Sequence, residues 1–187
     1  MDKRELRKEL KSLRNTLSIS DTRDYSRSIC ARITASKQYA EAKILLGYLA
    51  FGREPNIDFM LEQALADGKQ VCVPVVVDDI TIVPMQYRGL SFLQNGRYDI
   101  RIPAEPLLVT AKDSIDLVLV PGVGFDYFGN RMGMGAGYYD RLLPQISKAI
   151  LVGITYEILL RPQIPVDKYD ISVDYLVTEK QFITCNC

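Results

Sequence analysis

The sequence predicts an α/β fold: a single three-layer α/β/α domain around a mostly parallel sheet of about six strands. Short apolar runs alternate along the chain with segments of helical periodicity, the pattern of a parallel sheet covered by helices on both faces. The length of 187 residues suits one domain with a substantial core. No repeat, low-complexity tract or linker divides the chain, so we expect residues 1–187 to form one domain.

Two amphipathic helices are expected at the N-terminal end. A helix over roughly residues 2–17 is predicted by leucines at helical spacing, namely Leu6, Leu10, Leu13 and Leu17. A second helix follows, and Ser20 or Asp21 can cap its first turn. Its inward face is expected to carry Tyr25, Ile29 and Ile33. A third helix is expected over Ile57–Asp67, with Asn56 as its cap and Gly68 ending it.

Apolar runs predict the strands of the sheet. They are Ile44–Leu49, Gln70–Val76, Ile80–Tyr87, Ile115–Val120, Ala149–Ile154 and Asp174–Thr178. Pro84 weakens the third, because proline donates no hydrogen bond to a neighbouring strand. Residues 88–114 combine turn-forming glycines and prolines with little periodicity, so we expect an irregular segment there.

A glycine-rich segment follows the fourth predicted strand and precedes a short predicted helix. It holds half of the twelve glycines, namely Gly122, Gly124, Gly129, Gly133, Gly135 and Gly137. A strand–loop–helix turn of this kind can bind an anion through backbone N–H groups, and ligands of open parallel sheets bind beyond the carboxyl ends of the strands. The segment lacks the Gly-Lys-Ser/Thr ending of a P-loop. A nucleotide is the first hypothesis here, and a mobile surface loop is the alternative.

Composition excludes several classes of function. The formal net charge is zero, which argues against a nucleic-acid partner, and no apolar stretch approaches the roughly 20 residues of a membrane span. The charged N-terminal segment lacks the apolar region of a secretory signal, so we expect a cytoplasmic protein with reduced cysteines. Histidine is absent, which excludes Ser-His-Asp and Cys-His catalysis. Any metal would therefore be held by oxygen atoms, which favours Mg²⁺.

Carboxylates supply the candidate metal ligands. Asp140 comes just after the last glycine of the segment, where it could bind Mg²⁺ or merely favour the start of a helix. Asp170 could supply a second carboxylate, and on sequence alone Asp167 and Asp174 compete for that role.

Two further candidates lie in the first third of the chain. Lys3 and Arg7 are one helical turn apart and would project together, either as a clamp on phosphates or as a solvated helix face. Glu54 follows the first predicted strand, where it could bind substrate or simply lie at the surface.

Residues 119–143, which read LVPGVGFDYFGNRMGMGAGYYDRLL, resemble the signature of the 5-formyltetrahydrofolate cyclo-ligase family. Three other segments match in the order of the family, namely Lys3–Arg7, Tyr48–Asp58 and Pro165–Thr178. Met134 stands where many members carry Arg or Tyr, and Ala136 where many carry Gly or Lys. Arg101 interrupts the usual Ile-Pro-Glu-Pro-like run.

The resemblance implies an ATP- and Mg²⁺-dependent ligase of one-carbon metabolism. It would close 5-formyltetrahydrofolate to 5,10-methenyltetrahydrofolate with release of ADP and phosphate, by phosphorylating the formyl oxygen. The resemblance implies catalytic roles for Arg131, Tyr139 and Asp140, and metal binding by Asp140 and Asp170. It implies ATP binding by Lys3, Arg4, Arg7, Arg131, Met132, Gly133, Met134, Gly135, Ala136, Gly137, Tyr138 and Tyr139. It implies reduced-folate binding by Leu49, Glu54, Tyr98, Met134, Gly135, Ala136, Gly137 and Tyr138.

Two alternatives stay open beside this reading, and we expect a monomer in each case. The departures at Met134 and Ala136 are compatible with a non-catalytic member that binds a folate or nucleotide, or that associates with RNA, although the absence of net positive charge counts against RNA. An ATP-using enzyme that acts on a related small heterocycle is the other alternative.

Overall fold

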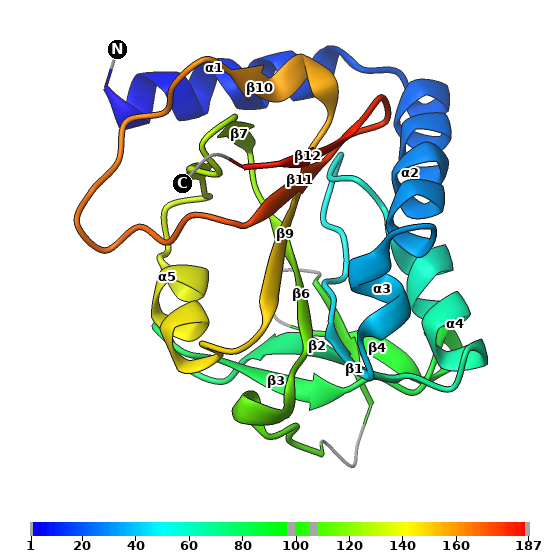
Figure 1. The fold of residues 1–187 in the computed structure, drawn as a ribbon. Coiled ribbons are helices and arrows are strands. Elements are labelled where there is room, and N and C mark those ends of the chain that lie inside the picture. The colour runs from blue at the N-terminus through cyan, green and yellow to red at the C-terminus, as the bar shows by residue number, and fades with distance from the viewer. Residues whose placement is uncertain (1, 97–99, 105–107, 186–187) are drawn as a thin grey trace.

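The computed structural model describes residues 2–96, 100–104 and 108–185 (Figure 1). Its centre is a seven-stranded sheet in the order β12-β11-β9-β6-β1-β2-β3. The strands are β1 (Ile44–Leu46), β2 (Gln70–Val76), β3 (Ile82–Gln86), β6 (Leu117–Pro121), β9 (Ile150–Ile154), β11 (Tyr175–Val177) and β12 (Phe182–Thr184). The strands from β11 to β2 pair in parallel, and the edge strands β12 and β3 pair antiparallel. The predicted mostly parallel α/β sheet is therefore confirmed, with the unpredicted strand β12 added at one edge.

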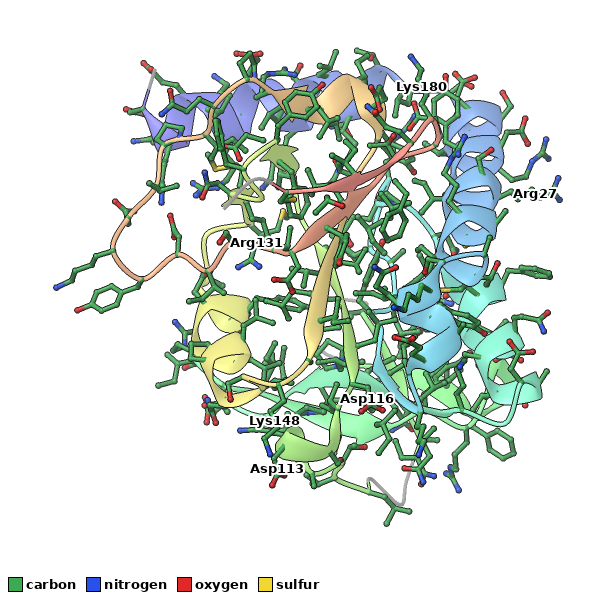
Figure 2. The ribbon with its side chains drawn as sticks, viewed as in Figure 1. Arg27, Asp113, Asp116, Arg131, Lys148 and Lys180 are labelled. Atoms are coloured by element: carbon green, nitrogen blue, oxygen red, sulfur yellow. The ribbon has the colours of Figure 1, made fainter. Side chains whose placement is uncertain are left out.

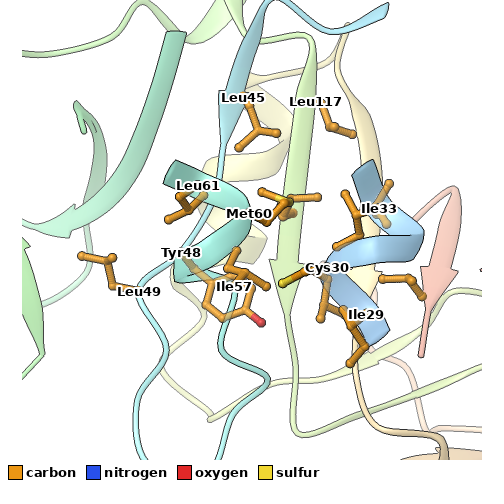
Figure 3. Packing of buried hydrophobic residues seen from close by; sticks show 14 of the residues in the cluster. Ile29, Cys30, Ile33, Leu45, Tyr48, Leu49, Ile57, Met60, Leu61 and Leu117 are labelled. Carbon is orange, nitrogen blue, oxygen red and sulfur yellow. The ribbon is translucent and has the colours of Figure 1, made fainter. Parts of the chain in front are cut away.

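Helices and apolar clusters cover both faces of this sheet. On one face, α1 (Lys3–Thr16), α2 (Ile19–Thr34), α3 (Lys37–Glu41) and α4 (Asp58–Ala66) contribute to one buried cluster. Figure 3 shows part of it, in which Ile33 of α2 and Met60 of α4 lie near Leu45 of β1. On the other face, α5 (Tyr138–Leu142) and the short helix η4 (Leu143–Gln145) pack against a second cluster that includes the neighbouring Leu46. Leu45 and Leu46 point to opposite faces, as the pleat of a strand requires.

The helix boundaries correct two of the predicted caps. The N-cap of α2 is Ser18 rather than Ser20 or Asp21, because the Ser18 hydroxyl accepts from the Asp21 N–H at 3.0 Å and Asp21 accepts from the Ser18 N–H at 3.2 Å. This is a capping box, with Asp21 three residues inside the helix. The N-cap of α4 is Ile57, although the Asn56 side chain accepts from the Asp58 N–H at 2.8 Å. Gly68, with φ of +79°, follows α4 as expected.

The segment 88–114 is more ordered than its composition predicts. It contains the short helices η1 (Leu90–Phe92) and η3 (Lys112–Ser114) and a hairpin of β4 (Leu93–Asn95) with β5 (Arg101–Pro103). Pro84 is tolerated in β3 because this strand lies at the sheet edge, where its carbonyl accepts from the Thr110 N–H at 2.9 Å.

Three remaining strands and one short helix complete the described architecture next to α1. The glycine-rich segment forms β7 (Gly124–Asp126) and β8 (Arg131–Met132), which join β10 (Leu160–Arg161) in a small sheet in the order β10-β7-β8. Helix α1 contacts η5 (Glu157–Leu159), which precedes β10, and Figure 1 shows α1 alongside β10. Among the described residues, no helix combines the length and apolarity needed to cross a lipid bilayer.

Candidate active site

A cavity of about 490 Å³ lies beyond the carboxyl ends of β1, β2 and β6. Residues that follow β1 line it (Tyr48 and Leu49), as do the last residues of β2 and β6 (Val76 and Pro121). Its volume is in the usual range of about 300–1,000 Å³ for small-molecule sites. Most of the predicted site residues line it, namely Lys3, Arg7, Leu49, Glu54, Arg131, Met132, Gly133, Met134, Gly135, Ala136, Gly137, Tyr138, Tyr139, Asp140 and Asp170.

Two of the predicted site residues lie elsewhere. Arg4 is exposed on α1 and is not among the lining residues. Tyr98 lies outside the described residues, but Ile100, two positions further along the chain, lines the cavity. Among the competing carboxylates, Asp167 lines the cavity beside Asp170, whereas Asp174 accepts from the Leu151 N–H at 2.7 Å beside the sheet.

The first half of the glycine-rich segment is held by a buried carboxylate. Asp126 is completely buried and accepts four hydrogen bonds, from the N–H groups of Phe128, Asn130 and Ile164 and from the Asn130 side chain, at 2.8–3.0 Å. These bonds close the β7–β8 turn and tie it to the chain after β10. The hairpin carries Arg131 into the cavity wall.

Several glycines of this half are required by packing. Gly129 has φ of +82°, and a Cβ atom there would lie 2.3 Å from the Val173 carbonyl oxygen. A Cβ on Gly124 would lie 2.7 Å from the Leu159 carbonyl oxygen. Such approaches are impossible for a larger residue without a backbone shift. The glycine density therefore has a structural cause in this part of the segment.

The second half of the segment, residues 133–137, differs from the first. Gly135 and Gly137 have φ of +106° and +68°, and a Cβ on Gly133 would meet no atom closer than 3.9 Å. None of the backbone N–H groups from 133 to 137 donates a hydrogen bond within the described part of the chain. Five consecutive N–H groups therefore stand unpaired in residues that line the cavity. N–H groups that have no partner in the described chain can donate to a ligand, and anions are the acceptors that they bind most strongly.

Arg131 is a buried cation of the cavity lining and lies next to α5 (Figure 2), whereas Arg27 and Lys180 point outward from the surface. Its Nη2 donates to Asp140 Oδ1 at 2.5 Å, and its guanidinium lies 5.5 Å from the centre of the Tyr139 ring. Burial lowers the pKa of Arg131, and the negative charge of Asp140 opposes that shift. Its Nη1 has no hydrogen-bond partner among the described residues.

The buried hydroxyl of Tyr139 likewise has no hydrogen-bond partner among the described residues. Burial raises the pKa of Tyr139 far above its ordinary value, so the phenol is neutral at physiological pH. A neutral hydroxyl can donate to an acceptor in the cavity.

Helix α1 closes one side of the cavity with two cations. Lys3 forms ion pairs with Asp167, at 2.7 Å, and with Asp170, and Arg7 donates from Nε to the Gly133 carbonyl at 2.8 Å. Burial would raise the pKa of Asp170, but the hydrogen bonds from Lys3 and from the Asp167 N–H, with the charge of Lys3, lower it overall. The helix thus holds its cations against the glycine-rich segment and the loop before β11.

Glu54 also lines the cavity and is largely buried, with 12% of its side chain exposed. It accepts from the Phe51 N–H at 3.1 Å, and its Oε1 lies 3.6 Å from Arg14 Nη1. Burial raises the pKa of Glu54, while the Phe51 N–H and the positive charge of Arg14 oppose the rise. Exposure at the surface is therefore the wrong description of this side chain.

Sequence reasoning missed several lining residues. Pro74 and Val76 of β2 and Ile82 of β3 form apolar wall, and the only sequence signal for them is their place near the ends of predicted strands. Arg101 also lines the cavity and forms a two-bond pair with Asp58, at 2.7 and 3.0 Å. In the sequence, Arg101 is noticeable only because it interrupts the Ile-Pro-Glu-Pro-like run.

The fold and this cavity define an α/β protein with a cation-lined small-molecule site at the carboxyl edge of its sheet. The model of the 5-formyltetrahydrofolate cyclo-ligase family matches residues 1–179, and the chain belongs to this family of enzymes.

Relatives match over nearly their whole length. The mouse 5-formyltetrahydrofolate cyclo-ligase is 29% identical, over 95% of this chain and 93% of its own. The solved structure of a 5,10-methenyltetrahydrofolate synthetase from Aquifex aeolicus is 30% identical, with a TM-score of 0.89 over 100% of this chain and 94% of that one. A 5,10-methenyltetrahydrofolate synthetase from Mycoplasma pneumoniae shares the fold, with a TM-score of 0.79 at 24% identity over 96% and 99% of the two chains.

Proposed function

We propose that this chain closes 5-formyltetrahydrofolate to 5,10-methenyltetrahydrofolate at the expense of ATP, releasing ADP and phosphate. Family membership and the names of the mouse and Aquifex relatives support the substrate. The observation that carries the proposal is the run of five N–H groups at residues 133–137 that have no partner among the described residues and lie beside Arg7 and Arg131. A backbone cradle with two guanidinium groups beside it suits the phosphates of a nucleotide.

The chemistry needs positioning and charge neutralisation more than proton transfer. The formyl oxygen attacks the γ-phosphorus, ADP leaves, and the carbon becomes bonded to a phosphorylated oxygen, which is a good leaving group. N10 then attacks this carbon, and phosphate leaves and takes up the proton that N10 loses. The methenyl bridge remains. No histidine is required, because the attacking formyl oxygen carries no proton. Lys3, Arg7, Arg131 and the N–H cradle offset the charge that moves onto ADP and phosphate.

The carboxylates of the cavity fit Mg²⁺ held jointly with phosphates. Asp140 uses Oδ1 for Arg131, and Asp170 uses Oδ2 for Lys3 and for the Asp167 N–H, so one oxygen of each has no donor among the described residues. The described residues contain no cluster of three or more metal-binding side chains. Mg²⁺ needs only one or two carboxylates when phosphates and waters complete its shell. When bound, Mg²⁺ would neutralise phosphate charge, with Asp140 and Asp170 as its protein ligands.

Glu54 and apolar residues would bind the folate. A carboxylate that accepts from the N–H groups of the pterin selects against ligands that lack those groups. Leu49 and Val76 supply apolar wall for the ring system. Met134, whose side chain is exposed in the cavity lining, supplies an apolar contact where many members carry a charged or hydroxyl-bearing one.

The test is a spectrophotometric assay of purified protein with 5-formyltetrahydrofolate. The methenyl product absorbs in the near ultraviolet, and we expect its absorbance to rise only when ATP and Mg²⁺ are both present. Folded protein that yields no such absorbance would contradict the proposal. Thermal stabilisation by folate or ATP without turnover would instead identify a binding protein of the same fold, the alternative that Met134 and Ala136 favour.

We further propose that the protein works as a cytoplasmic monomer. The buried free thiols of Cys30 and Cys72 are compatible with a reducing compartment. Light scattering of the purified protein would test the oligomeric state.

A further inference from the structure

Arg14 is a buried cation that has no role in the proposed reaction. It lies on α1 with 6% of its surface exposed, and its Nε and Nη1 have no hydrogen-bond partner among the described residues. Its ion-pair partner is Glu54, with 3.6 Å between Nη1 and Oε1. A guanidinium that is buried with unpaired donors is costly for the fold. A functional role for Arg14 would explain why the fold keeps a buried guanidinium that destabilises it.

The position of Arg14 on α1 indicates what that contribution is. Lys3, Arg7 and Arg14 lie on one stripe of the helix, because seven and eleven residues are close to whole numbers of turns. Lys3 reaches Asp170 and Arg7 reaches the Gly133 carbonyl. Arg14 reaches Glu54 and lies about 16 Å along the axis from Lys3 and about 10 Å from Arg7. One rigid helix therefore contacts the phosphate side and the folate side of the cavity.

We propose that Arg14 is a positioning residue that fixes the orientation and the negative charge of Glu54 for pterin binding. The inference rests on the proposed function, in which the Glu54 carboxylate accepts from the pterin. Arg14 itself touches no substrate in this scheme; it acts only through Glu54. The Phe51 N–H bonds the other carboxylate oxygen, Oε2, so the two contacts together hold both oxygens.

The electrostatics of the site make the charge of Glu54 depend on Arg14. The ionisable groups that act on Glu54 are Arg14 and Lys11 of α1 and the phenols of Tyr48, Tyr139 and Tyr156. Burial raises the pKa of each of these tyrosines, so they are neutral and cannot stabilise the carboxylate as cations do. Loss of Arg14 would leave burial opposed mainly by the Phe51 N–H and Lys11, and the pKa of Glu54 would rise. Glu54 would then be protonated at a higher pH, and folate binding would fail there.

The experiment compares Arg14→Met, Arg14→Lys and a control that removes a charge from the same helix, Lys8→Met, whose lysine is exposed. We expect Arg14→Met to raise the KM for 5-formyltetrahydrofolate at least about tenfold, as truncating one partner of a buried charge pair does. The KM for ATP should change little. The acid limb of the kcat/KM profile for folate should move to higher pH, and Arg14→Lys should recover part of both effects. Lys8→Met should match the wild type.

Direct titration separates this inference from the proposed function. In protein labelled with ¹³C at its glutamate carboxyls, the resonance lost in Glu54→Gln identifies Glu54, and its pKa should be higher in Arg14→Met than in the wild type. The titration needs no turnover. An inactive wild type would therefore contradict the proposed function, while the titration would still show whether Arg14 sets the pKa of Glu54. If Arg14→Met fails to fold, Arg14→Lys carries the comparison. An unchanged Glu54 titration, or an unchanged folate KM and pH profile in a folded Arg14 variant, would overturn the inference.

Discussion

The buried carboxylate of Asp126 offers a sharp test of how the glycine-rich segment is held. Asp126→Asn keeps the shape of the side chain but replaces one carboxylate oxygen with an NH₂ group. The oxygen that stays can still accept from Phe128 and Asn130, as Oδ1 does now. At the other position, Asn130 can rotate its amide to accept, but the Ile164 N–H, now 2.8 Å from Oδ2, would face another donor.

The magnitude follows from these contacts. A buried N–H left without an acceptor costs about 1–3 kcal/mol. The hydrogen bonds that survive weaken by roughly half, because their acceptor is no longer charged. Removing a buried charge relieves some desolvation. We therefore expect the free energy of unfolding to fall by about 2–3 kcal/mol, a large part of the roughly 5–15 kcal/mol that stabilises a typical domain.

The assay is equilibrium unfolding in urea followed by far-ultraviolet circular dichroism, since the chain has no tryptophan. With a slope of about 2 kcal/mol per molar urea, the midpoint should fall by roughly 1–1.5 M. Asp113→Asn is the matched control, because Asp113 is exposed and lies at the surface in Figure 2. An Asp126→Asn midpoint equal to that of the wild type, or a control that falls as far, would refute the reasoning.

The remaining predictions concern the cavity. Asp140→Asn should keep the fold and lose turnover by about 100-fold or more through weakened Mg²⁺ binding; turnover at the wild-type rate would remove Asp140 from the metal site. Arg7→Ala should raise the KM for ATP more than the KM for folate, and the reverse pattern in steady-state kinetics would contradict a phosphate-binding role. Gly129→Ala should lower the free energy of unfolding by at least about 2 kcal/mol, since its φ is +82° and the Val173 carbonyl blocks a Cβ. Gly133→Ala, where a Cβ meets no close atom, should unfold at nearly the wild-type midpoint.

Periodicity predicted most of the fold because the central strands are buried on both faces and therefore read as apolar runs. It failed where elements are too short to carry a period. Helix α3 spans five residues and depends on the Ser36 cap, and β12 spans three residues whose burial does not alternate. The hairpin β4–β5 is similarly short. The sequence does carry a signal for the cap at Ser18, because Ser18 and Asp21 have the spacing of a capping box.

The sequence identified most of the residues of the site, but it did not identify which of their side chains contact one another. The position of Asp140 after the glycines made it a candidate, and only the folded chain joins it to Arg131. Asp167, Asp170 and Asp174 were equivalent in sequence, and the turn before β11 decided among them by directing two into the cavity and one toward the sheet. These contacts depend on how the chain packs in three dimensions, and the local sequence pattern does not encode that packing.

The docking of α1 has a consequence for how the enzyme comes into being. Helix α1 is made early, yet Lys3, Arg7 and Glu9 contact Gly133, Arg161, Asp167 and Asp170, which all lie in the last third of the sequence. Until that last third is made, Arg7 lacks its partner on the glycine-rich segment and Lys3 lacks its partners on the loop before β11. The nascent chain can therefore assemble part of its sheet while its catalytic cavity still lacks one wall. The cavity is therefore complete only after residues 133–170 have been made and α1 has docked on them.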